Sequence, residues 1–161
     1  MSIRLTIVFI LFLSSELLTA TTTPCFVDKV VMISHSDLGH GGENKRYQIL
    51  YQKDHYEITA TTYRNFPHAG EVSFKPSSKT KHIEKSLKQT LAFIDTLVKD
   101  FDIFQLNTVE AKRLLHPIVY EFEIRDSCNI THSFKYTIEG NNHMNETYRE
   151  LIQDFINFFE N

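Results

Sequence analysis

The sequence has few cysteines, the residues that cross-link very small domains and that bind metals tightly in clusters. Its 161 residues include no tryptophan and only two cysteines, Cys25 and Cys128. Two cysteines exclude a framework of several disulfides, and neither has a second cysteine within four positions, as redox and zinc motifs do. Folding must therefore rest mainly on apolar burial, for which 13 Phe and 7 Tyr supply the largest side chains.

An excess of positive charge is also missing. The net charge is -3, and Lys and Arg are interleaved with Asp and Glu along the chain. A protein that follows the phosphates of a nucleic acid carries a basic stripe, so we expect no nucleic-acid partner. The proportions of 42% hydrophobic and 23% charged residues are those of an ordinary globular chain, and the length suits one domain.

The apolar run at residues 5–13 (LTIVFILFL) is too short to span a bilayer, which takes about 20 residues as a helix. It follows Arg4 and precedes a more polar stretch that ends in the small residue Ala20, which is the pattern of a secretory signal. We predict a signal peptide over residues 1–20, cleaved after Ala20, with an uncleaved anchor as the alternative. The mature chain is then secreted, extracellular or periplasmic, without a stable membrane anchor.

Both cysteines lie in the predicted mature chain. In an oxidising compartment a single pair is most simply a disulfide, so we predict a bond between Cys25 and Cys128. The bond closes a loop of about 100 residues, for which the chain-entropy model gives up to ~4 to 5 kcal/mol.

Two sequons, at Asn129 and Asn145, are glycan acceptors only if the chain passes through a eukaryotic secretory pathway. Asn129 lies in a predicted hairpin turn. Asn145 is also the predicted cap of a helix, so Asn129 is the better exposed of the two.

Alternation of apolar and polar residues predicts five strands in two groups. A linker at residues 21–25 precedes the first strand, and a glycine-containing loop at residues 34–45 follows it. The later strands pair as two hairpins. The predicted strands are residues 26–33, 46–52, 56–64, 118–125 and 132–138.

Apolar residues at steps of three and four predict helices at residues 79–104 and 145–160. Thr108 can cap a short third helix, which Pro117 ends. The order of elements is thus three strands, two helices, two strands and a helix. We predict one α+β domain over residues 26–161, an antiparallel sheet of about five strands with the helices packed on one face.

The loop after the first strand contains His35, Asp37 and His40, two imidazoles and a carboxylate that suit a divalent ion such as Zn²⁺. Three such groups leave the coordination incomplete, and their spacing matches no zinc signature. A metal-assisted hydrolase centred on this loop is one functional alternative, and a polar surface loop is the simpler interpretation. The glycines nearby match neither a Walker loop nor a dinucleotide fingerprint, so the sequence predicts no cofactor.

The polar face of the predicted sheet is the surface that most favours a function. A flat sheet face is a platform for another protein. The candidate residues are Glu57, Thr59, Thr61, Glu121, Glu123, Arg125 and Lys135.

Glu121 and Glu123 have the spacing of a glycosidase pair, about 7 Å by strand rise, but acids opposite Lys135 fit cross-strand charge pairing better. The sequence therefore favours a secreted, non-catalytic binding or inhibitory module that acts through this face and the loop at residues 35–43. A structural or envelope-associated secreted protein is a further alternative.

Overall fold

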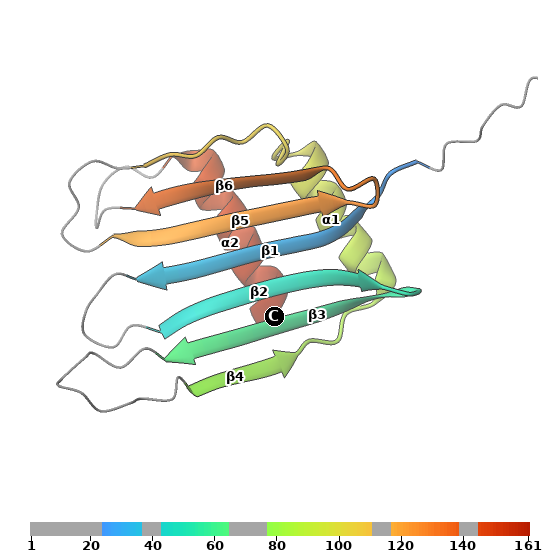
Figure 1. Cartoon of the computed structure of the whole chain (residues 1–161), viewed down its shortest axis with the longest axis horizontal. Coiled ribbons are helices and arrows are strands. Elements are labelled where there is room, and N and C mark those ends of the chain that lie inside the picture. The colour runs from blue at the N-terminus through green and yellow to red at the C-terminus, as the bar shows by residue number, and fades with distance from the viewer. Residues whose placement is uncertain (1–23, 37–42, 65–76, 111–116, 139–144) are drawn as a thin grey trace, which may run out of the picture.

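Alternating β-branched and aromatic residues build one antiparallel sheet (Figure 1). A computed structural model describes residues 24–36, 43–64, 77–110, 117–138 and 145–161. Within these ranges six strands lie in the order β4-β3-β2-β1-β5-β6, each antiparallel to its neighbours. The strands are β1 (Val27–Ser36), β2 (Glu43–Gln52), β3 (His55–Arg64), β4 (Ser77–His82), β5 (Ile118–Asp126) and β6 (Thr131–Ile138).

Strand β1 lies in the middle of the sheet and is apolar on both sides. Val30 and Met32 face the helices and are 1% and 0% exposed, whereas Val31 faces the other way and is 2% exposed. A strand that is covered on both faces needs a nearly continuous apolar run, which residues 30–33 provide. The interpretation of this segment as a mostly buried strand is confirmed.

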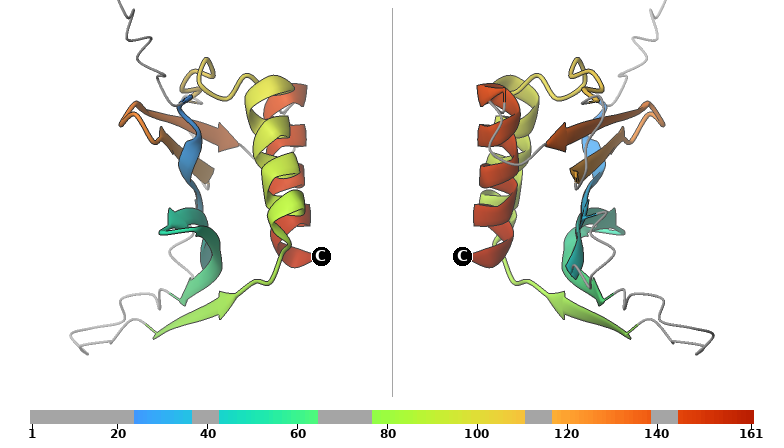
Figure 2. Two further views of the ribbon diagram at one scale, coloured as in Figure 1. Left: turned by 90° about the vertical axis from the view of Figure 1, so that its right-hand side faces the viewer. Right: turned by 90° about the vertical axis from the view of Figure 1, so that its left-hand side faces the viewer.

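Helices α1 (Leu87–Lys99) and α2 (Glu146–Glu160) both pack on the same face of the sheet (Figure 2). Ser86 caps α1, and Asn145 caps α2 as predicted. The apolar stripes of both helices turn toward the sheet, and Phe155 of α2 is 0% exposed. The hydrophobic core therefore lies between the sheet and the helix pair.

The helix predicted over residues 79–104 is wrong at both ends. Residues 77–82 form strand β4, and the N–H of Ile83 donates to a carbonyl of β3 at 2.9 Å. The helix begins only after Ser86 and ends at Lys99. Ile83, Leu87 and Leu91 stand at helical spacing, yet the two leucines are 57% and 46% exposed, so part of the periodic signal came from residues outside the core.

The short helix predicted after Thr108 also does not begin there. Val109 pairs with Tyr136 in a parallel bridge, and the hydroxyl of Thr108 accepts the N–H of Lys135 at 3.2 Å instead of capping a helix. Residues 111–116 lie outside the described part of the chain. The described residues thus contain one more strand and one fewer helix than predicted.

The predicted signal peptide, residues 1–20, lies outside the described residues. In the ranges that the structure describes, no helix has the length and apolar character needed to cross a membrane. Both predicted hairpins are confirmed, and the residues with positive φ in their turns are Lys53 and Asn129.

The predicted disulfide is confirmed. Cys25 and Cys128 are bonded, with 5.6 Å between their Cα atoms, and they are 103 positions apart in the sequence. The bond ties the segment before β1 to the turn between β5 and β6. It therefore fastens the start of the central strand to its neighbour's hairpin.

Replacing both cysteines by serine should lower the free energy of unfolding by about 2–5 kcal/mol, because the bond removes entropy from the unfolded chain. Urea titration followed by circular dichroism measures this loss. The reduced wild-type protein is the control and should behave like the double variant. An unchanged midpoint in both samples would contradict the prediction.

Candidate functional site

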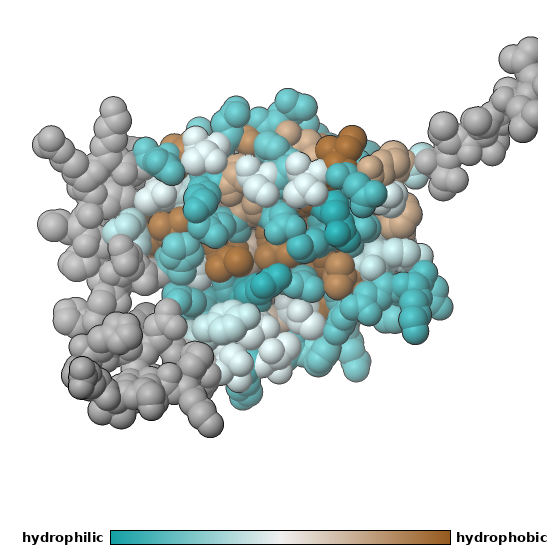
Figure 3. All heavy atoms as spheres, viewed as in Figure 1, coloured by the Kyte–Doolittle hydropathy of each residue, from teal (hydrophilic) through white to brown (hydrophobic). Residues whose placement is uncertain are grey.

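The face of the sheet opposite the helices is open, and it is the face turned to the viewer in Figures 1 and 3. Strand pairing decides which side chains reach it. Lys29, Val31, Ile33 and His35 of β1 point outward, and the residues that pair with them on β2 and β5 point the same way. Hydrophobic residues gather in the middle of this face and hydrophilic ones surround them (Figure 3).

Val31 and Ile33 form the apolar middle of the open face. Val31 pairs with Gln48 on one side and Glu123 on the other, and Ile33 pairs with Arg46 and Glu121. Val31 is only 2% exposed although neither described helix lies on this side, so the long polar side chains of the two neighbouring strands must cover it. The aliphatic parts of these side chains shield Val31 from water, as a second layer of helices would.

The two acids on this face each have a cationic partner. The ammonium of Lys29 donates to Glu123, and that of Lys135 donates to Glu121 at 2.6 Å. His35 Nε2 lies 3.6 Å from Oε1 of Glu121, the same oxygen that Lys135 contacts. The cross-strand charge pairing expected from the sequence is therefore present, and it holds both carboxylates in fixed positions.

The electrostatics of Glu121 suit a fixed anion and not a proton donor. The hydrogen bond from Lys135 lowers the pKa of Glu121, and His35 lowers it further. A glycosidase acid needs the opposite shift, because it must hold a proton at neutral pH. Glu121 therefore lacks the raised pKa that a glycosidase acid needs.

An open hollow of about 260 Å³ lies beside these ion pairs. Its lining includes Ile33, Arg46, Glu121, Ser133 and Lys135. Arg46 is half-buried, and its guanidinium donates to the neutral side chain of Gln48 at 3.0 Å. Among the described cations of this face, Arg46 differs from Lys29, Lys135 and Arg125 in having no carboxylate partner.

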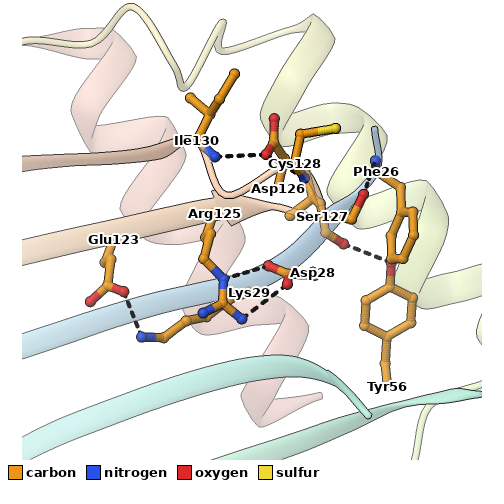
Figure 4. A network of polar contacts seen from close by, with 11 residues as sticks. Phe26, Asp28, Lys29, Tyr56, Glu123, Arg125, Asp126, Ser127, Cys128 and Ile130 are labelled. Atoms are coloured by element: carbon orange, nitrogen blue, oxygen red, sulfur yellow. Dashed lines mark hydrogen bonds and ion pairs between the residues drawn. The ribbon is translucent and has the colours of Figure 1, made fainter. Parts of the chain in front are cut away.

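Arg125 is fixed by a second group of contacts at the disulfide end of the sheet (Figure 4). Its Nε and Nη2 both donate to the carboxylate of Asp28, at 2.9 Å each. Nearby, Tyr56 donates to the carbonyl of Val27 at 2.8 Å. Arg125 thus joins β5 to β1 and is already occupied, so reversing its charge would disturb the fold as well as the face.

The other predicted face residues lie on β3, with β2 and β1 between it and β5. Glu57 accepts from Gln52 at 2.8 Å and lies 3.5 Å from His82. The hydroxyls of Thr61 and Thr80 are 3.0 Å apart, and Thr59 lies between Glu57 and Thr61 on the same face. The predicted residues therefore share one face but form two groups, separated by β2 and β1.

The predicted metal ligands are only partly placed. His35 stands on β1 beside Glu121, whereas Asp37 and His40 lie outside the described residues. In the described ranges no three His, Cys, Asp or Glu residues gather in a way that would hold a metal ion. The contact of His35 with Glu121 is a cross-strand neighbour contact within the open face.

Both sequon asparagines are exposed at the ends of elements. Asn129 stands in the turn before β6 with a φ of 65°, and Asn145 accepts the N–H of Thr147 at 3.0 Å as the cap of α2. The expected difference in role is therefore present. The Asn145 side chain has a structural contact, and the Asn129 side chain has none among the described contacts.

A second polar cluster closes the end of α2 on the helix side of the sheet. Glu160 accepts from Lys45 and from Tyr47, at 2.9 Å each. Burial, followed by the hydrogen bond to Glu160, raises the pKa of Tyr47 to about 12. The same two donors lower the pKa of Glu160.

Sequence reasoning did not single out Arg46 or the apolar pair Val31 and Ile33. A buried run shows that a strand is apolar, but only the register shows which of its residues face outward. Arg46 was only the first residue of the strand predicted at residues 46–52, and nothing local distinguished it from the paired cations. Arg46 is distinguished by the contacts of its neighbours, because the other cations of this face pair with carboxylates.

The fold and its face define the chain as a disulfide-linked α+β domain whose sheet is covered by helices on one side and by paired charges on the other. No protein-family model, curated protein or solved structure matches it. Function is therefore inferred from the described contacts.

Replacing Glu121 by glutamine should make stability less dependent on acid pH. A carboxylate with a lowered pKa stabilises the fold above its unfolded pKa, and that contribution is lost as the pH falls through the folded value. Unfolding free energies measured by urea titration between about pH 7 and pH 3 should therefore fall less steeply in the variant. Glu150→Gln, at an exposed position of α2, is the control and should follow the wild type; an E121Q slope equal to that of E150Q would contradict the ion pair.

Proposed function

We propose that the protein is a secreted, non-catalytic binding module whose partner is another protein docked on the open face of the sheet. The partner places a carboxylate against Arg46 and an apolar side chain against Ile33. Both contacts lie in the hollow of about 260 Å³. The predicted leader and the disulfide support the assignment to a secreted protein.

The contacts of Arg46 carry this proposal. A half-buried guanidinium whose described hydrogen bond goes to a neutral amide can bind a carboxylate without breaking a described ion pair. Interfaces concentrate their binding energy in an arginine or aromatic anchor surrounded by contacts that exclude water. Here the paired charges of Glu121 and Lys135 form that surrounding rim, since they are already satisfied within the chain.

The apolar middle of the face supports the same mode of binding. Ile33 is partly exposed at the hollow, and Val31 beneath the polar side chains is fully buried. A partner side chain that covers Ile33 removes apolar surface from water, which stabilises the complex. The same partner would desolvate Arg46 and strengthen its ion pair.

Site-specific photo-crosslinking tests the docking face. We would place p-benzoylphenylalanine at Ser133, an exposed position that lines the hollow, and at Lys88, an exposed position on α1. Each protein is irradiated in extracellular fluid of the source organism. We expect one discrete protein adduct from position 133 and none from position 88.

Competition decides whether Arg46 is the anchor. An excess of unlabelled wild-type protein should abolish the adduct, whereas an equal excess of Arg46→Glu should not, because a partner carboxylate is repelled by the new charge. Lys88→Glu is the matched control and should compete as the wild type does. Equal competition by R46E, or the same adducts from both labelled positions, would overturn the proposal.

We further propose that Asn129 is the principal glycan acceptor if the chain is made in a eukaryotic secretory pathway. The exposed turn and the lack of a described side-chain contact support this assignment. Expression in a eukaryotic secretory host should give a glycoform that Asn129→Gly shifts to lower mass. Glycine keeps the positive φ, so the fold is retained. A glycan lost with Asn145→Ser and kept in N129G would show the opposite order.

A further inference from the structure

The two edges of the sheet are not equivalent. At the β6 edge, Val109 donates to the carbonyl of Lys135 at 2.8 Å and accepts from Thr137 at 3.0 Å, so part of that edge is covered by the chain itself. At the opposite edge, neither α1 nor α2 lies on the outer side of β4, as the views in Figures 1 and 2 show. Within the described residues, strand β4 therefore presents an uncovered backbone edge.

The register shows which backbone groups point away from the sheet. The N–H of Ile83 donates to the carbonyl of Ile58 on β3. In an antiparallel pair every second residue of a strand forms hydrogen bonds with the same neighbour, so the register identifies the other residues of β4 that bond to β3. Lys79 and Lys81 consequently bond toward β3. Ser78, Thr80 and His82 direct their N–H and C=O groups outward, and the described residues offer these groups no partner.

The side chains of the same strand give this edge a positive charge. Lys79 and Lys81 point to the helix side of the sheet, where they line a cavity of about 310 Å³ together with Lys45 and Tyr47. The acid in this cavity is Glu160, whose carboxylate is held by Lys45 and Tyr47. In the described part of the chain, Lys79 and Lys81 have no acidic partner.

We propose that β4 receives an extended acidic segment of another protein as a seventh strand of the sheet. The outward N–H and C=O groups of Ser78, Thr80 and His82 pair with the backbone of that segment. Its acidic residues, at alternate positions, face Lys79 and Lys81 at the mouth of the cavity. Backbone hydrogen bonds position the bound segment, and the charges of Lys79 and Lys81 favour segments with acidic residues.

The same charges disfavour a second copy of this chain as the occupant. Antiparallel pairing of two β4 strands about Thr80 would place Lys79 of each copy opposite Lys81 of the other. Like charges directly opposite one another destabilise a strand pair. Lysines on an exposed edge thus reject self-association and still accept an acidic strand. This surface is distinct from the open face, and the variants that test it do not alter Arg46.

Binding of synthetic heptapeptides to the mature, disulfide-bonded protein tests the proposal. Fluorescence anisotropy of labelled TETETET should report saturable binding, and TKTKTKT should not bind. In a paired strand only alternate amides point toward the protein. We therefore expect N-methylation of one alternating set of amides to abolish binding and N-methylation of the other set to leave it.

Variants of β4 separate backbone pairing from charge. Thr80→Pro removes one outward N–H without touching the ladder to β3 and should weaken binding about tenfold, the effect of one lost hydrogen bond. Thr80→Val removes the hydroxyl that contacts Thr61 but keeps the N–H, and should bind as the wild type does. Lys79→Glu/Lys81→Glu should abolish binding, whereas Lys88→Glu/Arg149→Glu, with the same change in charge on the two helices, should not. Circular dichroism confirms that each variant is folded.

Three results would overturn the proposal. The first is equal binding of both N-methylated peptides, which would reduce the contact to charge alone. The second is binding of TETETET to K79E/K81E with wild-type affinity. The third is competition by inorganic phosphate at the concentration of the peptide, since a free anion would then satisfy the lysines without a strand. Because R46E leaves β4 intact, loss of open-face docking and loss of peptide binding are distinguishable.

Discussion

Two described helices cover one face of a six-stranded sheet, and the sheet must shield its other face with its own side chains. Strand β1 makes this necessary, because it is apolar on both sides and its outward Val31 is 2% exposed. Ion pairs from β5 to β1 and β6 hold the shielding side chains in place over it. The ion pairs of the open face therefore have a structural role, whereas Arg46, among the described cations of this face, contacts the neutral side chain of Gln48.

The two edges of the sheet are also protected by residues of the chain itself, but in different ways. A short bridge through Val109 occupies part of the β6 edge, and lysines on alternate positions protect the β4 edge from like strands. Charge protects an edge only against partners of the same sign. The open face and the β4 edge are thus two separate surfaces, and the partner that we propose for each is acidic.

Sequence patterns predicted the secondary structure correctly where the feature depends on residues that are close together in the chain. Both hairpins and the cap of α2 at Asn145 were predicted for this reason, whereas the disulfide was predicted because the sequence has only two cysteines. The helix prediction was wrong at residues 79–86, where Ile83 continues a ladder with β3 and the helical spacing of Leu87 and Leu91 lies on an exposed surface. The face residues were predicted as one surface, but the register divides them into a β3 group and a β5 group.

The sequence by itself determined the class of the domain, its pairing of cysteines, and the alternation that puts Glu121 and Glu123 on a polar face, because these depend on residue type and on spacing within one element. The tertiary structure alone decided that Lys135 and Lys29 neutralise those acids, that Arg46 keeps a neutral partner, and that β4 is an end strand of the sheet built by the described residues. Each of these depends on which strands lie side by side and in what register. That arrangement is set by contacts between residues far apart in the chain, which no local periodicity contains.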